Sequence, residues 1–194
     1  MNVLVTGADG QLGKTVAKLA EGCGNNYIFC DVSELDITDE SSVEACVLQN
    51  DIDVILNCAA YTNVDKAEDS PELADAVNHT AVAGMARIAK KHDVVLIHIS
   101  TDYVFGAEPY NKPCREEQQG TPTGVYGLTK LHGEERIKAV GGDFVIRNYL
   151  PSLIAACAAI SSALPRDFSV NTYFLMTARL SAAVAMPVPW KPKF

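Results

Sequence analysis

The segment that most constrains the fold lies at the start of the sequence. Residues 2–6, NVLVT, form a short apolar run, and residues 11–20, QLGKTVAKLA, have helical periodicity. Between them, Gly7, Gly10 and Gly13 are spaced G-x-x-G-x-x-G. A buried strand, a glycine turn and a helix in this order predict the first unit of a parallel α/β sheet.

The same pattern repeats over the first three quarters of the chain. Apolar runs predict strands at residues 26–32, 53–60, 93–100 and 143–148, and helical periodicity predicts helices at residues 39–50, 70–92 and 125–140. Strands that alternate with helices predict an α/β, doubly wound parallel sheet of the Rossmann type with right-handed crossovers.

Composition excludes some classes of function. The formal net charge is -8 and the hydrophobic fraction is 48%, so binding to nucleic acid or to an anionic membrane is not expected. No basic leader or membrane-spanning apolar stretch is present, which predicts a cytoplasmic location. Six cysteines without a C-x-x-C pair, together with His79 and His132, which have no partner at ligand spacing, predict no metal site.

The glycine turn indicates dinucleotide binding, because glycine lets a pyrophosphate approach the backbone at a helix N-terminus. Asp31 closes the second strand, where a carboxylate can bind the adenosine ribose and would favour NADH; a plain surface Asp is the alternative. Asp36 and Ile37 could reach the adenine, or belong to the start of the next helix. Ala59 and Ala60 follow the third strand, where small residues fit either close approach to a cofactor or tight packing.

Chemistry-bearing residues follow the fourth strand. Thr101 and Asp102 lie at the carboxyl edge of the predicted sheet, where open α/β sheets bind ligands. A hydroxyl there can donate to a substrate carbonyl oxygen, although both residues could instead cap the next turn.

Tyr126 and Lys130 are one helical turn apart and share a helix face. A phenol has an ordinary pKa near 10, and a neighbouring ammonium lowers that pKa toward the working range of a proton donor. We therefore expect Lys130 to activate Tyr126 as the acid that protonates a carbonyl oxygen, with Lys130 also at the nicotinamide ribose. An exposed helix pair is the alternative.

Over residues 1–147 the chain resembles the extended short-chain dehydrogenase/reductase family, and within it the dTDP-4-dehydrorhamnose reductases. The resemblance rests on VLVTGADGQLG, DVILNCAAYTNVDKAE, STDYVFG, VYGLTKLHGEE and FVIR. It implies NADPH or NADH as cofactor and reduction of the C4 ketone of a dTDP-sugar, dTDP-4-dehydro-L-rhamnose. It implies a catalytic triad of Thr101, Tyr126 and Lys130, and Thr101 and Asp102 as substrate contacts. The cofactor would be lined by Gly10, Gln11, Leu12, Asp36, Ile37, Ala59, Ala60 and Tyr61, with Gly7, Gly13, Asp31, Tyr126 and Lys130 added from the reasoning above.

After Arg147 the sequence departs from that resemblance. Residues 148–194 hold a single acidic residue, Asp167, and lack the strand and helix alternation. We expect a dinucleotide-binding domain at residues 1–147 and an atypical tail at residues 148–194, with the C-terminal substrate domain missing or rudimentary. The tail is either a frame-shifted or truncated segment or a divergent cap.

Two other functions remain open from the sequence. One is a non-catalytic NAD(P)-binding regulatory or interaction subunit, which the departure after residue 147 favours. The other is a nucleotide-sugar epimerase or dehydratase, for which a dehydratase's additional acid-base residues beside Thr101 are not found. A homodimer is possible.

Overall fold

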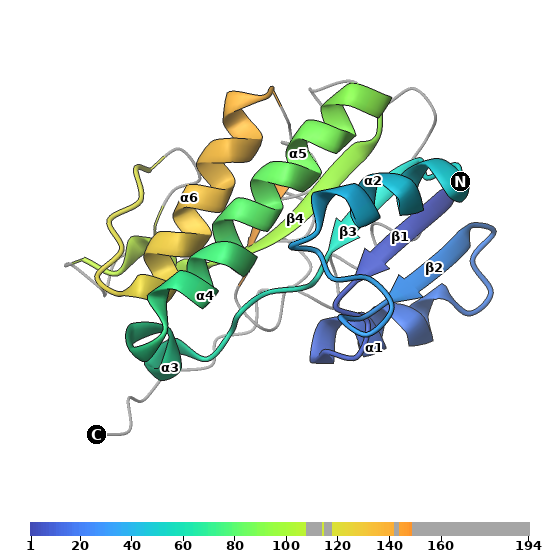
Figure 1. The fold of residues 1–194 in the computed structure, drawn as a ribbon. Coiled ribbons are helices and arrows are strands. Elements are labelled where there is room, and N and C mark those ends of the chain that lie inside the picture. Colours follow the sequence, from blue (N-terminus) through green and yellow to red (C-terminus); the bar gives the residue numbers. More distant parts are fainter. Residues whose placement is uncertain (108–113, 115–117, 142–143, 149–194) are drawn as a thin grey trace.

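Five parallel strands form one sheet in the computed structural model, which describes residues 1–107, 114, 118–141 and 144–148. The strands are β1 (Asn2–Thr6), β2 (Asn26–Cys30), β3 (Val54–Asn57), β4 (Val95–Thr101) and β5 (Phe144–Asn148). Their order is β2-β1-β3-β4-β5 (Figure 1), a doubly wound order that reverses direction between β1 and β3. The predicted parallel, doubly wound sheet is confirmed, and the two strands at the reversal carry the glycine turn and the segment with Ala59.

The helices follow the predicted alternation, with additions. They are α1 (Gln11–Ala20), α2 (Glu40–Gln49), α3 (Val64–Asp69), α4 (Pro71–Asp75), α5 (Ala81–His92) and α6 (Val125–Ala139), with a π-helical turn η1 (Ala76–Thr80) and a 3-10 turn η2 (Asp102–Phe105). The single helix predicted at residues 70–92 is built from α4, η1 and α5. Neither α3 nor η2 was predicted, because both elements are too short for a repeat of apolar residues to be recognised in the sequence.

Alternating side chains of the strands divide the core into two layers. Leu4 and Ile55 face a cluster with residues of α2, α5 and α6, whereas Val3 and Leu56 face a second cluster that includes Val16 of α1. The first cluster lies under the helices at the front of Figure 1. Burial on both faces explains why the strand sequences read as continuous apolar runs.

Two glycines let α6 approach its neighbours closely. A Cβ at Gly127 would clash with the carbonyl oxygen of Tyr103 in η2, and a Cβ at Gly133 would clash with that of Asn78 in η1. The helix that carries Tyr126 is therefore pressed against both irregular turns. Larger side chains at these glycines would push the phenol away from the sheet edge.

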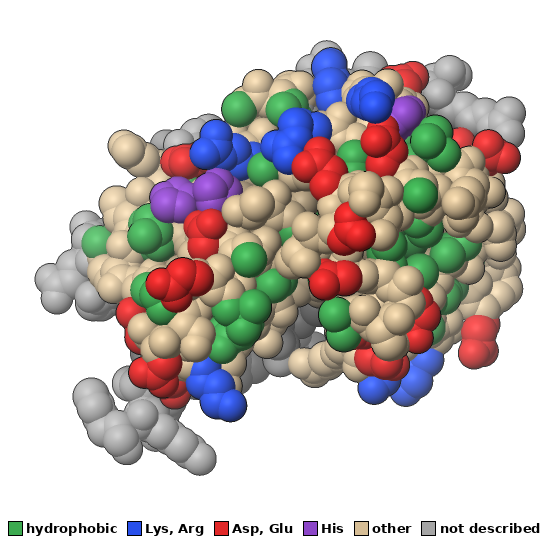
Figure 2. All heavy atoms as spheres, in the orientation of Figure 1, with side chains coloured by type: hydrophobic (Ala, Val, Ile, Leu, Met, Phe, Trp, Pro, Cys, Tyr) green, Lys and Arg blue, Asp and Glu red, His purple; other side chains and the backbone are tan. Residues whose placement is uncertain are grey.

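The remaining expectations concern the surface and the tail. None of the helices in the described part of the chain has the length and apolar character needed to cross a membrane. On the face shown in Figure 2, acidic side chains are interspersed with basic ones. Residues 149–194, which contain nearly all of the predicted tail, lie outside the described residues.

Candidate active site

The glycine turn joins β1 to α1 at the carboxyl edge of the sheet. Gly7 has a positive φ of 66°, and a Cβ there would lie 2.6 Å from the backbone nitrogen of Ala59. A Cβ at Gly13 would lie 2.6 Å from the Cα of Ala8, so these two positions need glycine for packing. Gly10 is different, because a Cβ there would meet only the oxygen of Gly7, at 3.2 Å.

The N-terminus of α1 is suited to an anion. Gly10 is its N-cap, no side chain caps the helix, and its first turn contains no acidic residue. Backbone N–H groups at such an end are directed outward and favour a negative group. Gln11 is exposed at the start of this helix, while Leu12 packs on the core. The turn can therefore accommodate the diphosphate of a dinucleotide.

Asp31 follows β2 and contacts the glycine turn. Its Oδ2 accepts a hydrogen bond from the backbone N–H of Asp9 at 2.7 Å, and its Oδ1 accepts from that of Val32 at 2.8 Å. The turn is also tied to β2 by Ala8, whose N–H donates to the oxygen of Cys30. The carboxylate lies beside the proposed diphosphate site, as a ribose-binding residue would.

Asp36 and Ile37 have local partners. Asp36 accepts hydrogen bonds from the backbone N–H and the hydroxyl of Thr38, which hold its pKa below its ordinary range. Ile37 is buried in the core under α2 and α5. The structure thus gives both residues a role in the turn before α2, and their contact with an adenine stays a prediction.

The segment after β3 passes close to the glycine turn. The N–H of Ala59 donates to Oδ1 of Asn57, and the backbone of Ala59 lies against Gly7. Ala60 and Tyr61 continue this segment and are half-buried. The close approach explains the small residues, and it leaves this segment at the switch point of the strand order.

Asn78 is a site-forming residue that the sequence pattern did not reveal. It is fully buried in the π-helical turn η1, accepts from the N–H of Tyr61 at 2.9 Å, and donates to the oxygen of Tyr61 at 3.1 Å. Its amide nitrogen also lies 3.2 Å from Oγ1 of Thr129 in α6. One side chain therefore joins the segment after β3 to the helix of Tyr126. Insertion of a π-turn leaves no distinctive residue pattern, so no local signal predicts it.

Thr101 and Asp102 lie where β4 ends. Thr101 is buried, and its Oγ1 accepts from the N–H of Tyr103 at 3.3 Å, so it caps η2 as the alternative interpretation expected. Its hydroxyl also lies 3.3 Å from Oδ1 of the exposed Asp102. Capping and a catalytic role are compatible, because the same hydroxyl reaches Tyr126.

Tyr126 lies in the first turn of α6, where its side chain interacts with that of Thr101. Its ring packs edge-on against Tyr103, with ring centroids 5.5 Å apart. Burial raises the pKa of Tyr126 above its ordinary value, the side chain of Thr101 opposes this increase, and the Asp102 carboxylate adds to it. The phenol is therefore protonated at neutral pH.

Lys130 makes its hydrogen bonds inside the core in this structure, and its activation of Tyr126 stays a prediction. Its Nζ donates to the oxygen of Ile99 at 2.6 Å and lies 3.1 Å from Nε2 of His98, inside the core. Burial outweighs the carboxylate of Glu134 and lowers the pKa of Lys130 to about 7. The i,i+4 spacing placed both residues on one face, but the deeper position faces the strand and not the sheet edge.

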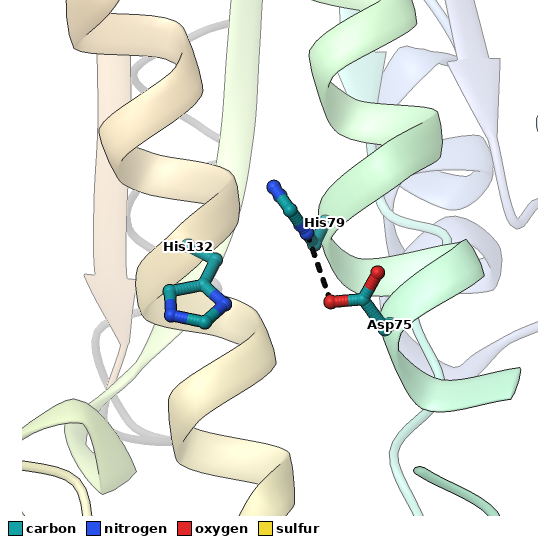
Figure 3. A group of neighbouring side chains, drawn as sticks. All are labelled: Asp75, His79 and His132. Carbon is teal, nitrogen blue, oxygen red and sulfur yellow. Dashed lines mark hydrogen bonds and ion pairs between the residues drawn. The ribbon is translucent and has the colours of Figure 1, made fainter. Parts of the chain in front are cut away.

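Three side chains on the helical layer come together outside this site. Asp75, His79 and His132 offer ligand atoms within 4.8 Å of one another, and the two imidazoles are 5.2 Å apart (Figure 3). Sequence spacing could not show this, because His132 is brought in by α6. His79 already lies 2.8 Å from the Asp75 carboxylate through Nδ1 and accepts from Nε of Arg136 at 3.0 Å. A metal ion bound at Nε2 of His79 would displace the guanidinium of Arg136 and would then be repelled by its positive charge.

Comparisons with known proteins identify the family of the chain. The family model of the RmlD substrate binding domain matches residues 1–148. A dTDP-4-dehydrorhamnose reductase of Mycolicibacterium smegmatis is 43% identical over 146 residues, which are 75% of this chain and 44% of that protein.

Solved structures of proteins with the same name are also similar to this chain. A dTDP-4-dehydrorhamnose reductase of Clostridium acetobutylicum is 37% identical with a TM-score of 0.70, covering 75% of this chain and 51% of that one. The enzyme of Bacillus anthracis, solved in complex with NADP, is 34% identical with a TM-score of 0.66, covering 74% and 51%.

This chain spans about half the length of the relatives that it matches. The match to the family model nevertheless covers most of the sequence and includes every predicted site residue. The predicted resemblance is thereby confirmed, and the chain belongs to the RmlD substrate binding domain family, whose relatives named above are dTDP-4-dehydrorhamnose reductases.

Proposed function

We propose that this chain binds NADH or NADPH at the glycine turn and reduces the C4 ketone of dTDP-4-dehydro-L-rhamnose to dTDP-L-rhamnose. Membership of the family and the names of the relatives support this reaction. The observation that carries the proposal is the placement of Thr101, where β4 ends, and of Tyr126, packed on Tyr103 in the turn that follows, at the same sheet edge as the glycine turn. A nicotinamide bound there would supply the hydride.

We assign the remaining steps of the proposed reaction to three side chains, Thr101, Tyr126 and Asp102. The hydroxyl of Thr101 donates to the ketone oxygen and fixes its position. Tyr126, kept protonated by burial, gives its proton to that oxygen as negative charge develops on it. Asp102, exposed beside them, is the proposed contact for the sugar. A raised phenol pKa suits reduction, because reduction needs the protonated form at the start.

The test is calorimetric titration of the 194-residue chain with NADH and with NADPH, followed by addition of dTDP-4-dehydrorhamnose and measurement of absorbance at 340 nm. The expected result is binding followed by oxidation of the dinucleotide. Binding without oxidation would contradict the catalytic proposal and favour a non-catalytic dinucleotide-binding subunit. No binding of either dinucleotide would overturn the proposal as a whole.

Two accompanying expectations stay predictions. The proposed enzyme acts in the cytoplasm, and it forms a homodimer. Analytical ultracentrifugation of the chain measures self-association directly, and a monomer at micromolar concentration would contradict the second expectation.

A further inference from the structure

Three buried polar side chains lie side by side across the sheet, on the face that α6 covers. Thr6, Asn57 and His98 are register partners on β1, β3 and β4. Oγ1 of Thr6 donates to Oδ1 of Asn57 at 2.7 Å, and Nδ2 of Asn57 lies 3.0 Å from Nδ1 of His98. His98 in turn lies 3.1 Å from Nζ of Lys130. We call Thr6, Asn57 and His98 the relay.

A backbone donor fixes the orientation of the amide. Oδ1 of Asn57 also accepts from the N–H of Ala59 at 3.1 Å. A backbone N–H can only donate, so the atom facing it must be the oxygen. The NH₂ group of Asn57 therefore faces His98 and donates to it.

The direction of that bond determines the tautomer of His98. Because Nδ1 accepts, the imidazole is neutral and its proton is on Nε2. Nε2–H then points at Nζ of Lys130. An ammonium has no lone pair to accept this hydrogen bond, whereas a neutral amine has one and can still donate to the oxygen of Ile99.

A charged Lys130 would leave one contact unsatisfied. If the ammonium donated to Nε2, Nδ1–H would face the amide of Asn57, and that amide would have to turn over. Its NH₂ would then face the N–H of Ala59. Because the side chains of Asn57, His98 and Lys130 are all buried, such a donor–donor contact is costly.

We propose that the relay holds Lys130 as a neutral amine inside the core, and that Lys130 takes up a proton when it leaves His98 for the cofactor. The second half of this inference rests on the proposed function. Thr6, Asn57 and His98 thereby act as positioning residues for the lysine. They also join it to the glycine turn, because Thr6 precedes Gly7 and Asn57 holds Ala59.

The charged and titratable neighbours agree with this arrangement. Burial lowers the pKa of Lys130 to about 7, against the opposing effects of Glu134 on α6 and Cys58 after β3. Burial lowers the pKa of His98 well below its ordinary value, and Lys130 adds to this decrease only in its protonated form. Glu134 accepts from Oγ of Ser100 at 2.6 Å. Tyr126, one turn before Lys130, is the remaining titratable group on this face of α6.

The direct test is nuclear magnetic resonance of the chain without added ligand. Nitrogen-15 shifts report the tautomer of His98, and the ε-carbon of Lys130, assigned through the backbone, reports its titration. We expect the Nε2–H tautomer and a titration midpoint near 7. The Nδ1–H tautomer, or a midpoint near the ordinary value of about 10.4, would overturn the inference.

Asn57→Asp tests the relay itself. A carboxylate at position 57 can accept from Thr6, Ala59 and Nδ1–H of His98 at once, so Nε2 becomes an acceptor for a charged Lys130. The expected result is a change to the Nδ1–H tautomer and an upward shift of the Lys130 midpoint by at least one pH unit. Asn63→Asp adds the same charge at the exposed N-cap of α3 and should change neither. Unchanged signals in a folded Asn57→Asp chain would contradict the relay.

Proton uptake tests the coupling to binding. Binding of NADH, titrated at pH 8.5 in buffers of different ionisation enthalpy, should be accompanied by uptake of close to one proton by the wild-type chain. The uptake by Asn57→Asp should be smaller by the fraction that is already protonated at this pH. Binding without proton uptake would refute the coupling. Absence of NADH binding would refute the proposed function. The resonance measurements would still decide whether the relay holds Lys130 as a neutral amine.

Discussion

The backbone N–H of Asp9 donates a 2.7 Å hydrogen bond to Oδ2 of Asp31, which ties the glycine turn to the end of β2. Glu34 lies beside Asp31, and its carboxylate accepts a hydrogen bond from the backbone N–H of Asp31 at 3.0 Å. Two carboxylates side by side would repel the additional phosphate of NADPH while accepting hydrogen bonds from the ribose of NADH.

Asp31→Asn should therefore shift cofactor preference toward NADPH. The amide oxygen still accepts from Asp9, but one negative charge is gone. We expect the ratio of the two dissociation constants to change by about tenfold, or roughly 1.4 kcal/mol. Calorimetric titration with both dinucleotides measures it. The control is Asp93→Asn, at a left-handed position before β4 that asparagine also tolerates. An unchanged ratio in Asp31→Asn would show that this carboxylate does not face the ribose.

The glycines of the turn should separate stability from binding. Gly13→Ala brings a Cβ against the backbone of Ala8 and should lower the free energy of unfolding by about 1 to 3 kcal/mol in urea. Gly24→Ala, where a Cβ meets nothing within 4 Å, should stay within about 0.5 kcal/mol of the wild type.

Gly10→Ala should weaken dinucleotide binding more than it weakens the fold. Its Cβ has only one neighbour inside the protein, at 3.2 Å, but it would enter the space in front of the α1 N-terminus. Titration with NADH and urea unfolding of the same preparation compare the two effects. A Gly10→Ala chain that binds NADH like the wild type would mean that the diphosphate lies elsewhere.

The N-terminal unit was predictable from sequence because its determinants are local. The apolar run, the three glycines and the helical period each act within a few residues, and β1, the turn and α1 form as expected. The same holds for α6, whose predicted range differs from the observed one by a single residue.

The position of Lys130 was not predictable in the same way. Helical spacing placed it beside Tyr126, but its side chain contacts Ile99 and His98, which lie 31 and 32 residues earlier in the chain, on β4. The closeness of His79 and His132 has the same origin, since η1 and α6 meet only in the folded sheet. Such contacts depend on register between distant segments, and no local pattern encodes them.

Tyr126→Phe should abolish reduction while leaving cofactor affinity nearly unchanged. The ring keeps its packing on Tyr103, so only the phenolic hydroxyl and its interaction with Thr101 are lost. We expect kcat to fall by roughly 100- to 10,000-fold, as for loss of a general acid. Oxidation of NADH at 340 nm gives kcat, and calorimetry gives the affinity. The control is Tyr27→Phe, which retains the stacking on Phe29 away from the site. Wild-type turnover in Tyr126→Phe would remove the phenol from the mechanism.

The buried amine of Lys130 should make the chain more stable as pH rises from 7. Its pKa is about 7 in the folded chain and near 10.4 in the unfolded chain, so between these values the unfolded state binds more protons. The free energy of unfolding then increases with pH by up to about 1.4 kcal/mol per unit. Urea unfolding between pH 7 and 8.5 measures this slope, below the range where the thiols of Cys30 and Cys46, whose pKa values burial raises, act in the opposite direction.

Lys130→Met isolates this contribution. Methionine fills the same buried space without a titrating group, so the slope should fall by roughly 1 kcal/mol per pH unit relative to the wild type. Lys138→Met, at an exposed position of the same helix, should keep the wild-type slope. If wild type and Lys130→Met show equal slopes, Lys130 binds its proton equally well in both states, and the core around His98 does not hold it as an amine.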